Sequence, residues 1–208
     1  MERDMIFSTG YQVPFPDRIV ESYEIKGNSL RANVSYDNLW RVLLHFINAP
    51  KYAGREMEPL FFFMELPASY DREKQLNANA EVTKLHKDVY YLDNLQADSA
   101  LAILQRSGEL LLNDGTVEFG FGRQFTHDEI ICGKYNVVTI WAQNPSQYEF
   151  IFEGLKFPRI PQLVTAWDTF TQDHPGKSTR VEIDGKSVFS LIEEYEPYGL
   201  YLAETRED

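Results

Sequence analysis

The chain has 208 residues, of which 43% are hydrophobic and 14% aromatic, so it can build a packed core and is not intrinsically disordered as a whole. It carries 32 Asp and Glu against 20 Lys and Arg, a formal net charge of −12. That charge repels phosphate backbones and anionic membranes and attracts cationic surfaces. We therefore expect a basic protein partner, with no nucleic-acid or membrane partner, although acidity can also serve only solubility.

The single cysteine, Cys132, excludes a fold held together by intrachain disulfides. The first residues carry charges of both signs and show no apolar run of the kind that marks a signal peptide. The densest apolar stretches, residues 39–47 and 60–64, are too short to span a bilayer. These features predict a cytoplasmic address.

The first third of the chain predicts a hairpin, a helix and a strand. Apolar residues alternate over 19–25 and 30–34 around a turn that contains Gly27, which is typical of a β-hairpin. Asp37 can cap a helix that reaches residue 47, and its wide apolar arc must be covered on at least two sides. Residues 60–66 are nearly all apolar, which is typical of a strand in the middle of a sheet.

The middle of the chain begins with the polar segment 68–81, an exposed helix or a mobile loop, where any domain boundary would lie. We otherwise expect one domain over residues 1–208. After a strand at 89–92, Asp98 or Ser99 can cap a helix that Gly108 ends. The sequence Asn113-Asp114-Gly115 between two apolar runs, 109–112 and 116–121, predicts a second hairpin.

The last third predicts short helices and strands in alternation. Thr126 and Glu129 have capping-box spacing, which predicts a helix over 126–132. The further elements we expect are a strand at 135–142, helices at 145–155, 161–170 and 188–195, a strand at 180–183, a turn at Asp184-Gly185, and a last strand at 199–203. Without a strict strand–helix–strand rhythm, this order favours an α+β fold with a mixed, largely antiparallel sheet and flanking amphipathic helices.

Three places in the sequence carry residues that could take part in chemistry. His127, Asp128, Glu129 and Cys132 crowd together, but their spacing is poor for a metal site and fits the start of a capped helix. Gly120 and Gly122 lack the rest of a phosphate loop and leave room for a bulky side chain such as Trp141. Cys132 follows two isoleucines, which indicates a buried, inert thiol. We predict no catalytic, cofactor-binding or metal-binding residues.

The C-terminal run from residue 193 to residue 201 is the best candidate for a binding surface. It places carboxylates beside phenol rings, and such groups suit the capture of Lys and Arg through hydrogen bonds and cation–π contacts. The predicted partner-binding residues are Glu193, Glu194, Glu196, Tyr198 and Tyr201. The alternative is that Tyr195 faces the core and the glutamates form the solvated side of its helix.

Three functions remain open from sequence. The first is a non-enzymatic protein that neutralises a basic partner, as a bacterial antitoxin-like immunity protein does. The second is a hydrolase or transferase whose catalytic groups converge only in the fold, in a pocket that holds a histidine or paired carboxylates. The third is a structural or regulatory module that forms homodimers through exposed aromatic side chains.

Overall fold

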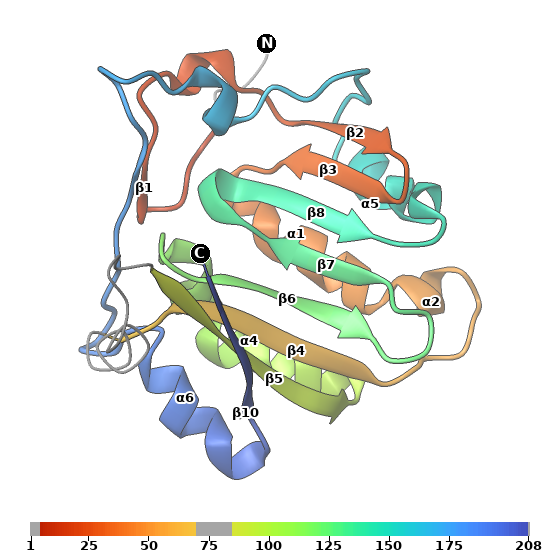
Figure 1. Ribbon diagram of the computed structural model, residues 1–208. Helices are drawn as coiled ribbons and strands as arrows, with labels where there is room; N and C mark the ends of the chain where they lie inside the picture. Colours follow the sequence, from red (N-terminus) through yellow and green to blue (C-terminus); the bar gives the residue numbers. More distant parts are fainter. Residues whose placement is uncertain (1–4, 70–84, 208) are drawn as a thin grey trace.

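The structure is a computed structural model that describes residues 5–69 and 85–207. Eight strands of the described chain form one sheet in the order β10-β5-β4-β6-β7-β8-β3-β2, and every neighbouring pair is antiparallel (Figure 1). Their bounds are β2 Ser22–Lys26, β3 Ser29–Asn33, β4 Leu60–Pro67, β5 His86–Leu95, β6 Glu118–Arg123, β7 Glu129–Cys132, β8 Val137–Trp141 and β10 Tyr201–Glu207. The short strands β1 (Tyr11–Gln12) and β9 (Lys177–Ser178) pair separately.

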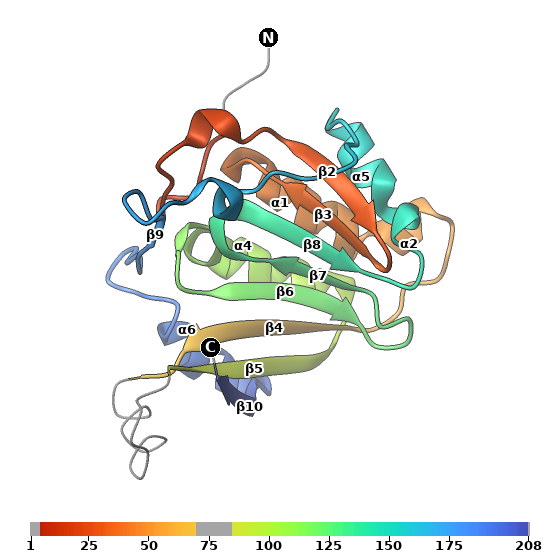
Figure 2. The ribbon, with the colours of Figure 1, turned by 45° about the horizontal axis from the view of Figure 1, so that its top comes forward.

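Helices α1 and α4 are the two long helices of the described chain, and the other helices are short. The α-helices are α1 Tyr36–Ile47, α2 Ala49–Tyr52, α4 Ala97–Asn113, α5 Glu149–Gly154 and α6 Ser190–Tyr195. The 3-10 helices are η1 Pro16–Arg18, η2 Lys134–Asn136, η3 Pro145–Tyr148, η4 Ala166–Thr169 and η5 Glu196–Tyr198. Helices α1 and α4 lie behind the sheet in Figure 1, and the turned view of Figure 2 shows the same arrangement. The fold is therefore α+β, as the sequence predicts.

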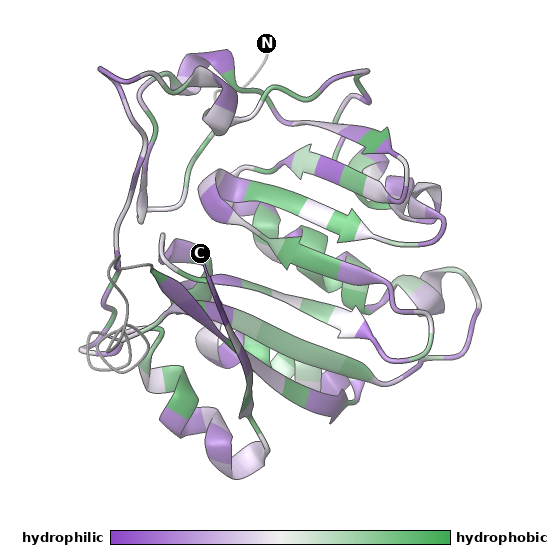
Figure 3. Cartoon of the chain, viewed as in Figure 1, coloured by the Kyte–Doolittle hydropathy of each residue, from purple (hydrophilic) through white to green (hydrophobic). Residues whose placement is uncertain are grey.

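The core lies between this helical layer and the sheet. Strand residues that point toward the helices, such as Leu30, Phe62, Phe121 and Ile140, are fully buried and belong to one hydrophobic cluster with Phe46 of α1. The hydropathy colouring of Figure 3 shows apolar residues gathered on the central strands, while β10 is largely hydrophilic. Burial of this apolar surface is the main favourable contribution to folding.

Several predicted elements are confirmed. Strands β2 and β3 form the first hairpin, with Gly27 at φ 55° in the turn. Helix α1 buries a wide arc, and β4 runs in the middle of the sheet between β5 and β6. The helical stretch from residue 145 onward is also present, as η3 and α5, and Asp184-Gly185 forms a turn with positive φ at both residues.

Other predicted elements were wrong. Residues 109–112 continue α4, so Gly108 does not end that helix and Asn113 is its last residue. The segment predicted as a helix over 126–132 contains strand β7, because Ile130 and Cys132 alternate into the core with period two.

The helix ends also differ from expectation. Helix α1 is preceded by Ser35 at its N-cap rather than by Asp37, and α4 begins at Ala97, before Asp98. The predicted helix over 161–170 is reduced to η4, and residues 180–183 are not a strand. Most of the polar segment 68–81 lies outside the described residues.

The two edges of the sheet are unlike each other. Beside β2, the backbone N–H of Tyr23 donates to the carbonyl of Pro158 at 3.0 Å, and that of Ile160 donates to the carbonyl of Tyr23 at 2.8 Å. The chain therefore covers part of this edge. At the opposite edge, β10 pairs with β5 alone among the described strands, and its residues are exposed except for the half-buried Thr205.

Candidate partner-binding site

The C-terminal run folds into α6, η5 and the start of β10. Tyr195 is buried, and its hydroxyl lies 2.6 Å from Ser107 Oγ on α4, so it anchors α6 to that helix. Gly199 adopts φ 101°, a left-handed conformation that suits glycine, and the chain turns there into β10. Tyr195 thus faces the core, as the alternative interpretation of this run expected.

The three glutamates of the run have different surroundings. Glu194 lies 3.2 Å from Lys186 Nζ and 3.6 Å from Arg106 Nε, so its charge is largely neutralised within the chain. Glu193 and Glu196 are exposed, and neither side chain forms a hydrogen bond or ion pair with the described residues. These two carboxylates are therefore the ones available to a partner.

The two exposed phenols of the run, Tyr198 and Tyr201, have different hydrogen-bond partners. Tyr198 is 66% exposed, and its hydroxyl helps to raise the pKa of the Arg106 guanidinium through a side-chain hydrogen bond. Tyr201 lies on β10, stacks on Tyr91 and donates a hydrogen bond to Asp93 Oδ2 at 2.9 Å. That bond raises the pKa of Tyr201 because it stabilises the protonated phenol. Tyr198 therefore contacts α4, and Tyr201 contacts β5.

A groove of about 740 Å³ lies beside Tyr198, between α4 and the end of β5. Its lining residues are Leu92, Asp93, Asn94, Leu95, Ser99, Ala102, Ile103, Gln105, Arg106, Tyr195 and Tyr198. Several of these are apolar and buried, such as Leu92 and Ile103. The groove therefore combines an apolar floor with polar groups at its edge, which is typical of a binding pocket.

Sequence reasoning found the phenols but missed the other side of this groove. Asp93 and Arg106 come from β5 and α4, about a hundred residues earlier in the chain. The only available signal was the mixed face of α4, where Ala102 and Ile103 alternate with Ser99 and Arg106. Nothing in that pattern indicates a partner element from the C-terminal run.

The candidate metal or catalytic cluster at residues 127–132 does not converge. His127 lies in the β6–β7 turn with φ 57°, while Asp128 accepts hydrogen bonds from Tyr148 Oη at 2.7 Å and Gln147 Nε2 at 2.9 Å. Glu129 lies on β7. Across the described residues, no group of three or more His, Cys, Asp or Glu is placed to hold a metal ion.

Cys132 is buried, and burial raises the pKa of its thiol to about 12. The hollow that it lines measures only about 10 Å³, room for at most about one water molecule. A thiol that stays protonated and has no space beside it is a poor nucleophile.

The glycine face of β6 is explained by neighbouring phenylalanines. A Cβ atom at Gly122 would lie 2.0 Å from the Phe61 ring, and one at Gly120 would lie 1.8 Å from the carbonyl oxygen of Ile130 and 2.9 Å from the Phe63 ring. The glycines therefore make room for the rings of Phe61 and Phe63 on β4, and not for Trp141.

Comparison with protein-family models, curated proteins and solved structures finds no match, so the geometry of the groove is interpreted by itself. Among the described residues, no helix has both the length and the apolar character that a membrane crossing requires.

Proposed function

We propose that this chain is a non-enzymatic binding protein that holds a basic protein partner at the groove between α4, β5 and η5. The observation that carries the proposal is the position of Tyr198 at the groove edge, on the same pair of helices as the unpaired carboxylates Glu193 and Glu196. An exposed aromatic ring beside an apolar recess is the usual anchor of a protein interface. Unpaired carboxylates on the same two helices favour lysine and arginine on the partner.

The charge inside the groove supports the same conclusion. Among the described residues, Arg106 is the one cation that lines the groove, and Glu194 lies within ion-pair distance of its guanidinium. Asp93 adds a carboxylate to the groove lining, and its Oδ2 accepts the hydrogen bond from Tyr201. A partner that inserts an apolar side chain and carries basic residues on either side would match this distribution. Neutralisation of such a partner is the action of an antitoxin-like immunity protein.

An enzymatic function has less support. None of the four hollows described for the surface is lined by a histidine. One hollow of about 120 Å³ has Glu58 and Asp128 in its lining, but Glu58 accepts hydrogen bonds from Thr126 and the backbone of Phe125, and Asp128 accepts from Tyr148. These carboxylates hold a turn and a helix in place.

The test first captures the partner protein and then locates its binding site on this chain. The tagged chain is incubated with lysate of its native host at low ionic strength, and a stoichiometric basic protein released by moderate salt is purified. We expect the double variant E193K/E196K to bind that protein at least tenfold more weakly, mainly through slower association. A matched variant, E153K/E182K, reverses two other exposed carboxylates and should change the affinity less than twofold.

The proposal has two points of failure. Equal weakening by both double variants would show that net charge, not this site, drives binding. Capture of no basic protein would reject the function itself. Tyr198→Ala tests the aromatic anchor, and we expect a loss of about 1–2 kcal/mol in binding free energy with unchanged thermal stability.

A further inference from the structure

We infer that the face of the sheet opposite α1 and α4 carries a second site, which binds a small anion with a planar aromatic ring. The site is a hollow of about 410 Å³ over β3, β8 and β7. Its size lies within the usual range for small-molecule sites. The side chains that carry the argument are Arg31, Lys87, Lys134, Thr139, Trp141 and Trp167. This inference is independent of the proposed partner-binding groove.

Two indole rings border this hollow, and neighbouring rings hold one of them, Trp167, in place. Trp141, at the end of β8, is 48% exposed, and Trp167, in η4, is 52% exposed. Trp167 packs edge-on against Tyr135 with ring centroids 4.8 Å apart, and Phe170 supports it at 5.6 Å. Rigid, half-exposed indoles are suited to stack on a planar ligand, since little side-chain freedom is lost on binding.

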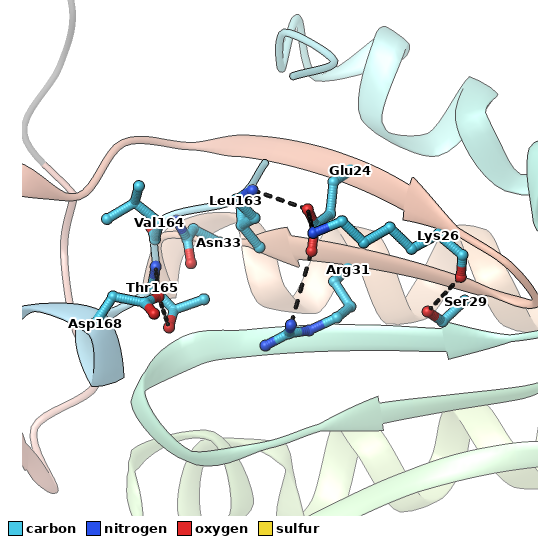
Figure 4. A network of polar contacts seen from close by, with 9 residues as sticks. All are labelled: Glu24, Lys26, Ser29, Arg31, Asn33, Leu163, Val164, Thr165 and Asp168. Carbon is cyan, nitrogen blue, oxygen red and sulfur yellow. Dashed lines mark hydrogen bonds and ion pairs between the residues drawn. The ribbon is translucent and has the colours of Figure 1, made fainter. Parts of the chain in front are cut away.

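The cations of the hollow differ in how far they are neutralised. Lys87 lies 2.8 Å from Glu118, which also lines the hollow, and Arg31 lies 3.7 Å from the buried Glu24 (Figure 4). The Lys134 side chain forms no ion pair or hydrogen bond with the described residues. The hollow therefore keeps one positive charge without a counter-charge, in a chain whose formal net charge is −12.

The backbone fixes the position of Lys134. The next two residues, Tyr135 and Asn136, have φ of 57° and 58°, a conformation that non-glycine residues adopt only when surrounding contacts hold them. Asn136 supplies such contacts, because its Nδ2 donates to the carbonyl of Val34 and its Oδ1 accepts from Ser8 Oγ at 2.9 Å. A lysine whose backbone is held beside two indoles can bring its ammonium to the anionic group of a small ring compound.

The test uses the indole N–H signals in a two-dimensional ¹⁵N–¹H NMR spectrum of the whole chain. The chain has three tryptophans, and Trp40 lies on the helical face, where it packs against Gly108, so it serves as an internal control. The probes are 2-naphthoate, its uncharged amide 2-naphthamide, and adenosine monophosphate. We expect naphthoate or the nucleotide to shift the Trp141 and Trp167 signals in a saturable way below about 1 mM, with the Trp40 signal unchanged.

Variants separate the role of charge from that of the rings. Lys134→Ala should weaken binding of the anionic probe at least fivefold and leave the naphthamide response unchanged, whereas the matched variant Lys156→Ala, which removes another exposed cation, should have no effect. Saturation by naphthoate alone assigns aromatic carboxylates, and saturation by the nucleotide alone assigns aromatic phosphates. The inference is overturned if neither anion saturates the shifts, or if Lys134→Ala binds as well as the unaltered chain.

Discussion

The indole of Trp40 on α1 packs directly against Gly108 in the middle of α4. A Cβ atom at Gly108 would lie 2.7 Å from Trp40 Cζ3, closer than side chains tolerate. Gly108 therefore lets the two helices approach, and α4 continues through it to Asn113. The glycine serves a contact between helices and not a helix end.

Gly108→Ala should accordingly destabilise the fold. Alanine gains about 1 kcal/mol in helix propensity, but overpacking against the indole costs about 1–3 kcal/mol. We expect a net loss in the free energy of unfolding, measured by urea titration. Gly154→Ala at the end of α5 is the matched control, because a Cβ there meets nothing within 4 Å, and it should be neutral or slightly stabilising. A Gly108→Ala chain as stable as the original would contradict this account.

This contact explains why part of the fold could not be predicted from the sequence. Gly108 and Asn113-Asp114-Gly115 have the local signals of a helix end and a hairpin, and the tertiary contacts that override them come from distant residues. Asp114 Oδ2 accepts the backbone N–H of the distant Val181 at 2.9 Å, while its Oδ1 accepts that of Thr116 at 2.7 Å within the turn. A Cβ at Gly115 would lie 2.3 Å from the carbonyl oxygen of Gly10. Asp114 therefore stabilises a turn, and Gly115 allows a close approach of two backbone segments.

The same reasoning applies to the wrongly predicted helix over 126–132. Thr126 is not a helix cap. Its backbone N–H and its hydroxyl donate hydrogen bonds to Glu58, at 3.0 and 2.9 Å, and Glu58 lies in the loop before β4. By contrast, the β2–β3 hairpin, α1 and β4 were predictable because their patterns are local. The same holds for the candidate site. Tyr198 could be predicted because it belongs to a local run of acidic and aromatic residues, but the groove could not, because it also needs residues of β5 and α4.

Glu24 should be a source of acid sensitivity. Its carboxylate is almost fully buried and accepts hydrogen bonds from the Leu163 N–H at 2.9 Å and from Lys26 at 2.8 Å (Figure 4). Desolvation alone would raise the pKa of Glu24, but the bond with Lys26, the bond from Leu163 and the charge of Arg31 outweigh it, so the pKa is lowered.

The sign of the effect follows from this lowered pKa. The stability that Glu24 contributes is present above its unfolded pKa, near 4.3, and is lost as the pH falls through the folded pKa. Glu24→Gln should therefore cost about 1–3 kcal/mol at pH 7, with the difference shrinking below about pH 4. Urea titrations from pH 3 to pH 7 would measure it, with the exposed Glu153→Gln as control. A constant difference over that range would mean that the carboxylate charge is not involved.

Arg123 is a buried cation whose contribution can be separated into packing and charge. It is 1% exposed, its Nη2 donates to the carbonyl of Phe46 at 2.5 Å, and its guanidinium carbon lies 5.0 Å from the centre of the Phe46 ring. Its Nε and Nη1 have no hydrogen-bond partner among the described residues. The residue therefore fills space and bonds the end of α1, while part of its polar surface is unsatisfied.

Two substitutions test this division. Arg123→Ala should lower the free energy of unfolding by about 3–5 kcal/mol, because it leaves a cavity and unpaired carbonyls at the end of α1. Arg123→Met keeps most of the volume and removes the unsatisfied N–H groups, so we expect a loss below about 1.5 kcal/mol. Thermal and urea unfolding of both variants would measure the difference. An equal loss in both would show that the bonds to the α1 carbonyls, rather than packing, dominate.

Glu129 should give the opposite pH dependence to Glu24. Its side chain is half-buried on β7 and forms no hydrogen bond or ion pair with the described residues, so desolvation raises its pKa, and the nearby His127 only partly opposes this. The folded state then binds a proton more tightly than the unfolded state. Between the unfolded pKa near 4.3 and the raised folded pKa, stability falls as the pH rises.

Glu129→Gln removes the carboxylate that burial disfavours, so the variant should be more stable than the original chain at pH 7, and the gain should disappear as the pH approaches 4. Glu118→Gln is the matched control on the adjacent strand: it loses the 2.8 Å ion pair with Lys87 and should be destabilised by up to about 1 kcal/mol at pH 7. Urea titrations of both variants at several pH values would distinguish the two behaviours. A Glu129→Gln chain less stable than the original at pH 7 would mean that the ionised carboxylate is favoured in the fold, against the direction of its pKa.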